Sequence, residues 1–75
     1  MDIGKAMAKI RQECEISRPD MAKLLKITPS ALWKIENGRS LPKEKTIARF
    51  CDALRIPLAR LYIESLQPED FIIED

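Results

Sequence analysis

The sequence predicts an all-α fold, a compact domain of five helices. Two observations support this class. Apolar side chains recur at spacings of three and four residues in successive segments, as they do on one face of a helix. Residues that typically begin and end helices stand between these segments. A chain of 75 residues, of which 45% are hydrophobic and 33% charged, has the size and composition of one small globular domain.

The first helix is expected over residues 3–14. Ile3, Met7 and Ile10 recur along this segment at helical spacing and would form one apolar face. Asp2 precedes the segment and can cap the helix, because its carboxylate can accept a bond from a free backbone N–H.

Two short helices are expected next, over residues 18–26 and 29–37. Ser17 can cap the first of them with its hydroxyl. Thr28 can cap the second, and Pro29 fits its first position, where the N–H that proline lacks would have no partner in the helix. Two helices of this length with a short connection are typical of a helix-turn-helix, which presents its second helix to a DNA groove.

Two further helices are expected in the second half of the chain. Gly38 can end the preceding helix in a left-handed conformation, and a helix is then expected over residues 44–54. Its start is poorly capped, with Lys43 at the capping position, although Glu44 in the first turn partly compensates through the helix dipole. The last helix follows Pro57.

The C-terminal end of the chain is expected to be separate from the domain. The last helix should stop near Ser65, because Pro68 cannot continue it. This divides the chain into a helix-turn-helix domain, residues 1–65, and an acidic and apolar tail, residues 66–75. Disorder is the default expectation for such a tail. Folding back onto the domain and pairing with a partner chain are the alternatives.

The charges are unevenly distributed along the chain. Residues 1–60 hold all 13 Lys and Arg against 7 acidic residues, whereas residues 61–75 hold 5 acidic residues and no basic one. The overall net charge of +1 conceals this division. The body is therefore basic, as phosphate binding requires, and the C-terminal end is acidic.

Several classes of function are not supported by the sequence. The chain has no His and only two Gly, so we expect no enzymatic activity and no phosphate-binding glycine loop. Cys14 and Cys51 do not suggest a disulfide framework or a metal site and are expected to be small packing residues. We expect no cofactor, no metal and no small-molecule ligand. The lack of a signal peptide or a long apolar run predicts a cytoplasmic protein that does not contact a membrane.

Residues 16–42 read ISRPDMAKLLKITPSALWKIENGRSLP, and this pattern resembles the lambda-repressor/Cro-like helix-turn-helix family, also called the xenobiotic-response-element type. The resemblance extends over about residues 3–63. The positions that carry it are Ile16-Ser17-Arg18, Met21-Ala22, Ile27-Thr28, Leu32, Ile35-Glu36-Asn37-Gly38 and Pro42. Three residues depart from the family pattern: Arg18 replaces a Gln, Pro29 replaces a residue that often reads bases, and Arg55 replaces a Gly.

The resemblance implies roles for individual residues. Arg11 and Glu36 are expected to form a partly buried ion pair that locks the first helix to the end of the recognition helix. The N-terminal part of a recognition helix carries the base contacts, which are expected here from Pro29, Ser30 and Lys34. Contacts to the DNA backbone are expected from Ser17, Arg18, Thr28, Ala31, Trp33, Asn37, Arg39 and Lys43. For Trp33, a ring that rests on the loop at 39–42 is the alternative.

The most direct interpretation is a sequence-specific regulator of transcription that binds double-stranded DNA. It would be a repressor that binds a palindromic operator as a homodimer, with half-sites about 34 Å apart. The expected dimer surface consists of Tyr62, Ile63, Leu66, Phe71, Ile72 and Ile73, which exceed what a small core can absorb. The alternative is a protein-interaction module, antitoxin-like or coactivator-like, that keeps the helix-turn-helix fold.

Overall fold

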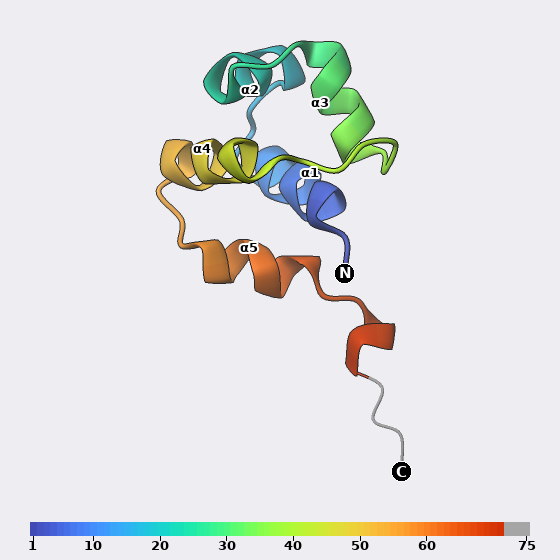
Figure 1. Cartoon of the computed structure of the whole chain (residues 1–75). Helices are drawn as coiled ribbons and strands as arrows, with labels where there is room; N and C mark the ends of the chain where they lie inside the picture. The colour runs from blue at the N-terminus through green and yellow to red at the C-terminus, as the bar shows by residue number, and fades with distance from the viewer. Residues whose placement is uncertain (72–75) are drawn as a thin grey trace.

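The computed structural model describes residues 1–71, which form five α-helices and one short 3-10 helix (Figure 1). Their bounds are α1 Ile3–Glu13, α2 Arg18–Leu25, α3 Pro29–Glu36, α4 Glu44–Leu54, α5 Leu58–Ser65 and η1 Pro68–Phe71. Figure 1 shows α2 and α3 at one end of the molecule, α1 and α4 in the middle and α5 beyond them. The all-α class with five helices is therefore confirmed. None of the helices in residues 1–71 is long and apolar enough to cross a membrane.

The two middle helices join the two ends of the molecule. α1 packs against both α3 and α5, while α4 packs against both α2 and α5. α2 and α3 also pack against each other, as the helix-turn-helix prediction requires. The exposed helix pair is thus carried on a base formed by α1 and α4.

The helices begin at the capping residues expected from the sequence. Three side-chain oxygens each accept a bond from the backbone N–H three residues further on: Asp2 from Lys5 at 2.9 Å, Ser17 from Asp20 at 3.2 Å, and Thr28 from Ala31 at 3.0 Å. Lys43 makes no side-chain capping bond at the start of α4, as predicted. α1, α2 and α3 each end one residue earlier than expected.

A residue in the left-handed conformation follows each of the first four helices. Gly38 adopts this conformation after α3, with φ 73°, as predicted. The other three positions have side chains: Glu15 with φ 56°, Lys26 with φ 58° and Arg55 with φ 53°. The Arg55 backbone thus takes the conformation for which glycine is best suited, at a cost of about 1–2 kcal/mol.

The core lies between the helices and is formed by apolar side chains from all five of them. The largest fully buried ones are Met7, Ile10, Met21, Leu25, Leu32, Phe50 and Leu61. Cys51 is also buried, and burial, followed by the charge of Asp52, raises the pKa of its thiol. Cys14 is exposed, so its predicted packing role is wrong. It lies in the turn after α1, where the chain leaves the helix and no second layer covers it.

The described part of the tail lies beside the N-terminus. The backbone N–H of Asp2 donates to the Ser65 carbonyl at 2.9 Å, and the N-terminal amine of Met1 lies 2.9 Å from an Asp70 carboxylate oxygen. This amine and the backbone N–H of Gln67 lower the pKa of Asp70. Residues 66–71 therefore contact the N-terminus through the Asp70 ion pair, while Phe71 stays 64% exposed. Ile72 and Ile73 lie outside the described residues.

Gly4 sets the distance between α1 and α3. A Cβ atom built on Gly4 would overlap the carbonyl oxygen of Ile35 and come within 3.0 Å of its carbonyl carbon. Because both atoms belong to the backbone, they cannot move aside as a flexible side chain could. The absence of a side chain at Gly4 therefore allows α1 to cross directly against the last turn of α3.

We expect Gly4→Ala to destabilise the domain by about 3 kcal/mol, the upper end of the usual cost of overpacking, because backbone atoms must move. An ordinary Gly→Ala change inside a helix would instead stabilise it by about 0.5–1 kcal/mol. Gly38→Ala is the control, since a Cβ there meets nothing within 4 Å and only the positive φ opposes it. Urea denaturation measures both free energies of unfolding. Equal losses in the two variants would contradict the close approach.

Candidate nucleic-acid interface

α3 is anchored along one side and exposed along the other. Leu32 is fully buried and Ile35 is 7% exposed, so these two side chains hold the helix on the core. Pro29, Ser30 and Lys34 are all exposed. Ser30 and Lys34 are four residues apart and therefore lie on the same face of the helix. The residues expected to contact bases thus share the accessible side of α3.

A groove runs beside this face of α3 and is lined only by neutral and basic residues among those described. Its five basic side chains come from three parts of the chain: Lys26, Lys34, Lys43, Lys45 and Arg49. Thr28 and Ser30 contribute hydroxyl groups to the same groove. Positive charge gathered in a groove without opposing carboxylates attracts a polyanion.

Three of these basic residues were missed by the sequence analysis. Lys26 takes the left-handed position after α2, Lys45 lies in the first turn of α4, and Arg49 lies one turn further along α4. Arg49 also donates from Nη1 to the Leu25 carbonyl at 3.3 Å and so joins α4 to the end of α2. Only the general excess of basic residues in the body of the chain pointed to them.

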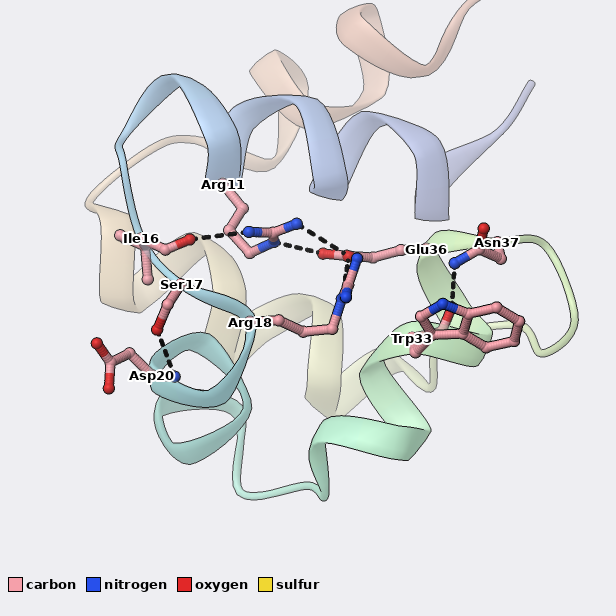
Figure 2. Close-up of polar contacts among 8 residues, drawn as sticks. All are labelled: Arg11, Ile16, Ser17, Arg18, Asp20, Trp33, Glu36 and Asn37. Atoms are coloured by element: carbon pink, nitrogen blue, oxygen red, sulfur yellow. Dashed lines mark hydrogen bonds and ion pairs between the residues drawn. The ribbon is translucent and has the colours of Figure 1, made fainter.

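The residues expected at the DNA backbone are distributed around α2, α3 and the loop that follows. Thr28, Ala31 and Lys43 line the groove, whereas Arg39 is exposed in the loop after α3. Ser17 and Thr28 cap their helices, as described above. The side-chain amide of Asn37 donates to the Trp33 carbonyl at 2.9 Å, which fixes Asn37 at the end of α3 (Figure 2). The Trp33 side chain is 44% exposed.

The expected ion pair between Arg11 and Glu36 is present and nearly buried (Figure 2). Arg11 Nε lies 2.7 Å from Glu36 Oε2, and Arg11 Nη2 lies 3.1 Å from Glu36 Oε1, which is a bidentate arrangement. Arg11 Nη1 donates to the Ile16 carbonyl at 2.9 Å. The guanidinium thus joins α1, the chain entering α2 and the end of α3.

Arg18 makes a contact that the sequence analysis missed. Its Nε donates to Glu36 Oε1 at 2.9 Å, so one carboxylate accepts from two arginines. The Glu36 side chain is 3% exposed, whereas the Arg18 side chain is 37% exposed. Arg18 therefore connects the buried pair to the surface at the start of α2. No local sequence pattern indicates this contact, because the two residues are 18 positions apart.

The residues expected at the dimer surface lie away from the groove, on α5 and η1. Tyr62, Ile63 and Phe71 are exposed by 49%, 66% and 64%, and Leu66 is half-buried. Ile72 and Ile73 are not among the described residues. Exposed apolar side chains of this size form a surface suited to contact with another protein.

Comparison with known proteins agrees with this geometry. A family model described as a helix-turn-helix domain matches residues 2–61. The chain belongs to the helix-turn-helix family. The expected family is thereby confirmed, and the protein is a DNA-binding regulator of transcription, similar to phage control proteins.

Individual relatives support the same assignment. The ImmF control region 10 kDa protein of Bacillus phage phi105 is 32% identical over 65 residues, which are 87% of this chain and 72% of the phage protein. A crystal structure of the clp gene regulator ClgR from Corynebacterium glutamicum matches with a TM-score of 0.81 and 25% identity, over 85% of this chain and 68% of ClgR. A second ClgR structure has the same TM-score at 22% identity, over 97% of this chain and 92% of the other, and shows the likeness in fold.

We expect Arg11→Gln to destabilise the helix-turn-helix domain by about 3 kcal/mol, because it leaves the buried Glu36 carboxylate with one cationic partner instead of two. Arg60→Gln is the matched control. Arg60 lies 4.0 Å from Glu13 in an exposed pair, for which a loss below about 0.5 kcal/mol is typical. Thermal and urea unfolding measure both variants. A loss at Arg11 as small as that at Arg60 would contradict a structural role for the buried pair.

Proposed function

We propose that the protein is a repressor that occupies a palindromic operator as a homodimer, with α3 of each subunit in the major groove. One observation carries the proposal: α3 exposes Ser30 and Lys34, which line a groove with four further basic side chains and no acid among the described residues. DNA phosphates would contact the basic side chains outside α3, while Ser30 and Lys34 contact base edges. A cytoplasmic location and the lack of an enzymatic step are part of the same proposal.

The proposed base contacts come from the first half of α3. Ser30 can donate to or accept from either kind of base edge, and Lys34 suits the O6 and N7 acceptors of guanine. Pro29 offers an apolar contact, such as one with a thymine methyl group. Because none of these three side chains is a bidentate partner for a base, we propose that DNA shape and bridging water contribute part of the specificity.

The proposed backbone contacts surround this face. They comprise Ser17, Arg18, Thr28, Ala31, Trp33, Asn37, Arg39 and Lys43, to which the groove adds Lys26 and Lys45. Contacts of this kind fix the register of the protein on the duplex and supply most of the salt dependence of binding.

We propose that α5 and the tail form the dimer surface, with residues 1–65 as the DNA-binding domain. A single domain of this size buries little DNA surface, and two domains on half-sites about 34 Å apart would double the contact. The exposed apolar side chains of Tyr62, Ile63 and Phe71 support this surface because they lie on α5 and η1, away from the groove.

A protein-interaction role is the second candidate. It is favoured by the same exposed apolar side chains, which lie in the acidic C-terminal end of the chain and could bind another protein instead of a second copy. A gel shift with random-sequence DNA at low and moderate salt separates the two functions. Retarded DNA supports the operator proposal, whereas free DNA at both salt concentrations favours the interaction module.

We expect Lys34→Ala to weaken binding to the preferred site by about 1–3 kcal/mol and to relax discrimination at one base pair, because a base contact is lost. Selection from a random DNA pool identifies the site, and titration measures the affinity. Lys5→Ala is the control, since Lys5 is exposed on α1 beside the C-terminal segment rather than in the groove. A uniform loss on all sequences would make Lys34 a phosphate contact instead.

We expect Ile63→Glu to shift the protein from dimer to monomer, since it places a charge among the exposed apolar side chains of α5 without disturbing the core. Ile63 is 66% exposed, so the monomer should remain folded. Leu24→Glu is the control, because Leu24 is a 48% exposed apolar residue on α2. Analytical ultracentrifugation measures the state with and without operator DNA. A wild-type monomer at high micromolar concentration in both conditions would end the dimer proposal.

A further inference from the structure

We propose that Glu36 is the positioning residue for a phosphate contact made by Arg18. In this arrangement the Glu36 carboxylate holds the Nε side of the Arg18 guanidinium, and the outer Nη groups are left to bind a DNA phosphate. The inference rests on the proposed DNA-binding function and deepens it, because it assigns a role to a residue that is too buried to touch DNA itself.

The N–H donors of the Arg18 guanidinium allow it to contact Glu36 and a phosphate at the same time. An arginine side chain has five N–H donors in a rigid plane, one on Nε and two on each Nη. Arg18 uses its Nε–H on Glu36 Oε1 at 2.9 Å. Its Nη groups donate to no other residue within 1–71. A guanidinium held at its Nε by a carboxylate still presents two Nη groups, whose spacing matches that of phosphate oxygens.

Burial decides which of the three charged groups can meet DNA. The Glu36 and Arg11 side chains are 3% and 8% exposed, whereas that of Arg18 is 37% exposed. Two guanidinium groups share one carboxylate, so the cluster of Arg11, Glu36 and Arg18 carries one unbalanced positive charge. Figure 2 shows the Asp20 carboxylate turned away from Arg18. Arg18 is therefore the one member of the cluster whose side chain is partly exposed and could bring this excess charge to DNA.

Glu36 already has one structural partner without Arg18. Arg11 already forms a bidentate pair with this carboxylate and also donates to the Ile16 carbonyl. Arg18 adds a third hydrogen bond to Glu36, and this bond fixes the Arg18 side chain before DNA binds. A long side chain fixed in advance loses less conformational freedom on binding, so the same contact gives a tighter complex.

The Arg18→Lys variant keeps the positive charge but removes the planar guanidinium, so it tests the positioning of the side chain apart from its charge. An ammonium group is a point charge and cannot present one edge to Glu36 and another to a phosphate. We expect Arg18→Lys to keep the salt dependence of DNA binding but to weaken binding about tenfold. Arg18→Gln should also weaken binding and reduce the slope of log K against log salt by about one unit. Arg60→Lys, at a 51% exposed side chain near Glu13, is the control.

Nuclear magnetic resonance of the wild-type chain gives a test that does not depend on any variant folding. The probe is a mixed-sequence duplex of about 20 base pairs, or two helical turns, at low salt. In the free protein the Nε–H signals of Arg11 and Arg18 should exchange slowly with water. On adding the duplex, the Arg18 Nε–H should stay protected while its Nη–H signals shift and become protected as well.

Each other outcome contradicts the inference. If the Arg18 Nε–H loses protection in the complex, Arg18 leaves Glu36 to bind DNA, and Glu36 does not position it. If the Nη–H signals do not change, or if Arg18→Lys binds as tightly as wild type, a positioned phosphate contact is excluded. The backbone signals of Ser30 and Lys34 distinguish failure of this inference from failure of the proposed DNA binding. If these signals shift but those of Arg18 do not, only the positioning of Arg18 by Glu36 is contradicted. If no signal shifts, DNA binding is contradicted as well.

Discussion

The arrangement of the DNA-facing helices depends on one buried carboxylate. Glu36 ends α3 in a position where water cannot solvate its charge, which would be costly without partners. Arg11 from α1 and Arg18 from α2 supply those partners through three hydrogen bonds. Hydrogen bonds to charged groups are directional as well as strong, so the ends of three helices are fixed relative to one another. The orientation of α3 is therefore a property of the ion cluster as much as of the apolar core.

Packing fixes the same helix from the other side. Gly4 lets the backbone of α1 approach the backbone of α3 at Ile35, one residue before Glu36. Leu32 then inserts into the core one turn earlier. Steric contact and ion pairing thus act on neighbouring residues at the end of α3. The first turn of the helix, which carries Pro29 and Ser30, is left exposed and receives only its cap from Thr28.

The features that could be predicted from the sequence are the local ones. A capping bond spans three residues and an apolar face repeats within one turn, so Ser17, Thr28 and the five helices were evident from short segments. The Arg11–Glu36 pair was expected only through the family resemblance. The Arg18 contact and the groove residues Lys26 and Lys45 were missed, because they depend on how segments distant in sequence come together. The contact of Asp70 with the N-terminus is missed for the same reason, since 69 residues separate the two groups.

The separation of charge along the chain is only partly kept in space, because Lys9 pairs with Glu64 at 3.1 Å and the N-terminal amine pairs with Asp70 at 2.9 Å. The basic groove lies beside α3, whereas Glu64, Glu69 and Asp70 belong to α5 and η1, which Figure 1 places at the far end of the molecule. The groove at the reading face therefore holds an excess of positive charge that the opposite end of the molecule does not share. In the field of a duplex, such a molecule turns while it is still approaching, so a larger share of collisions begins in a productive orientation.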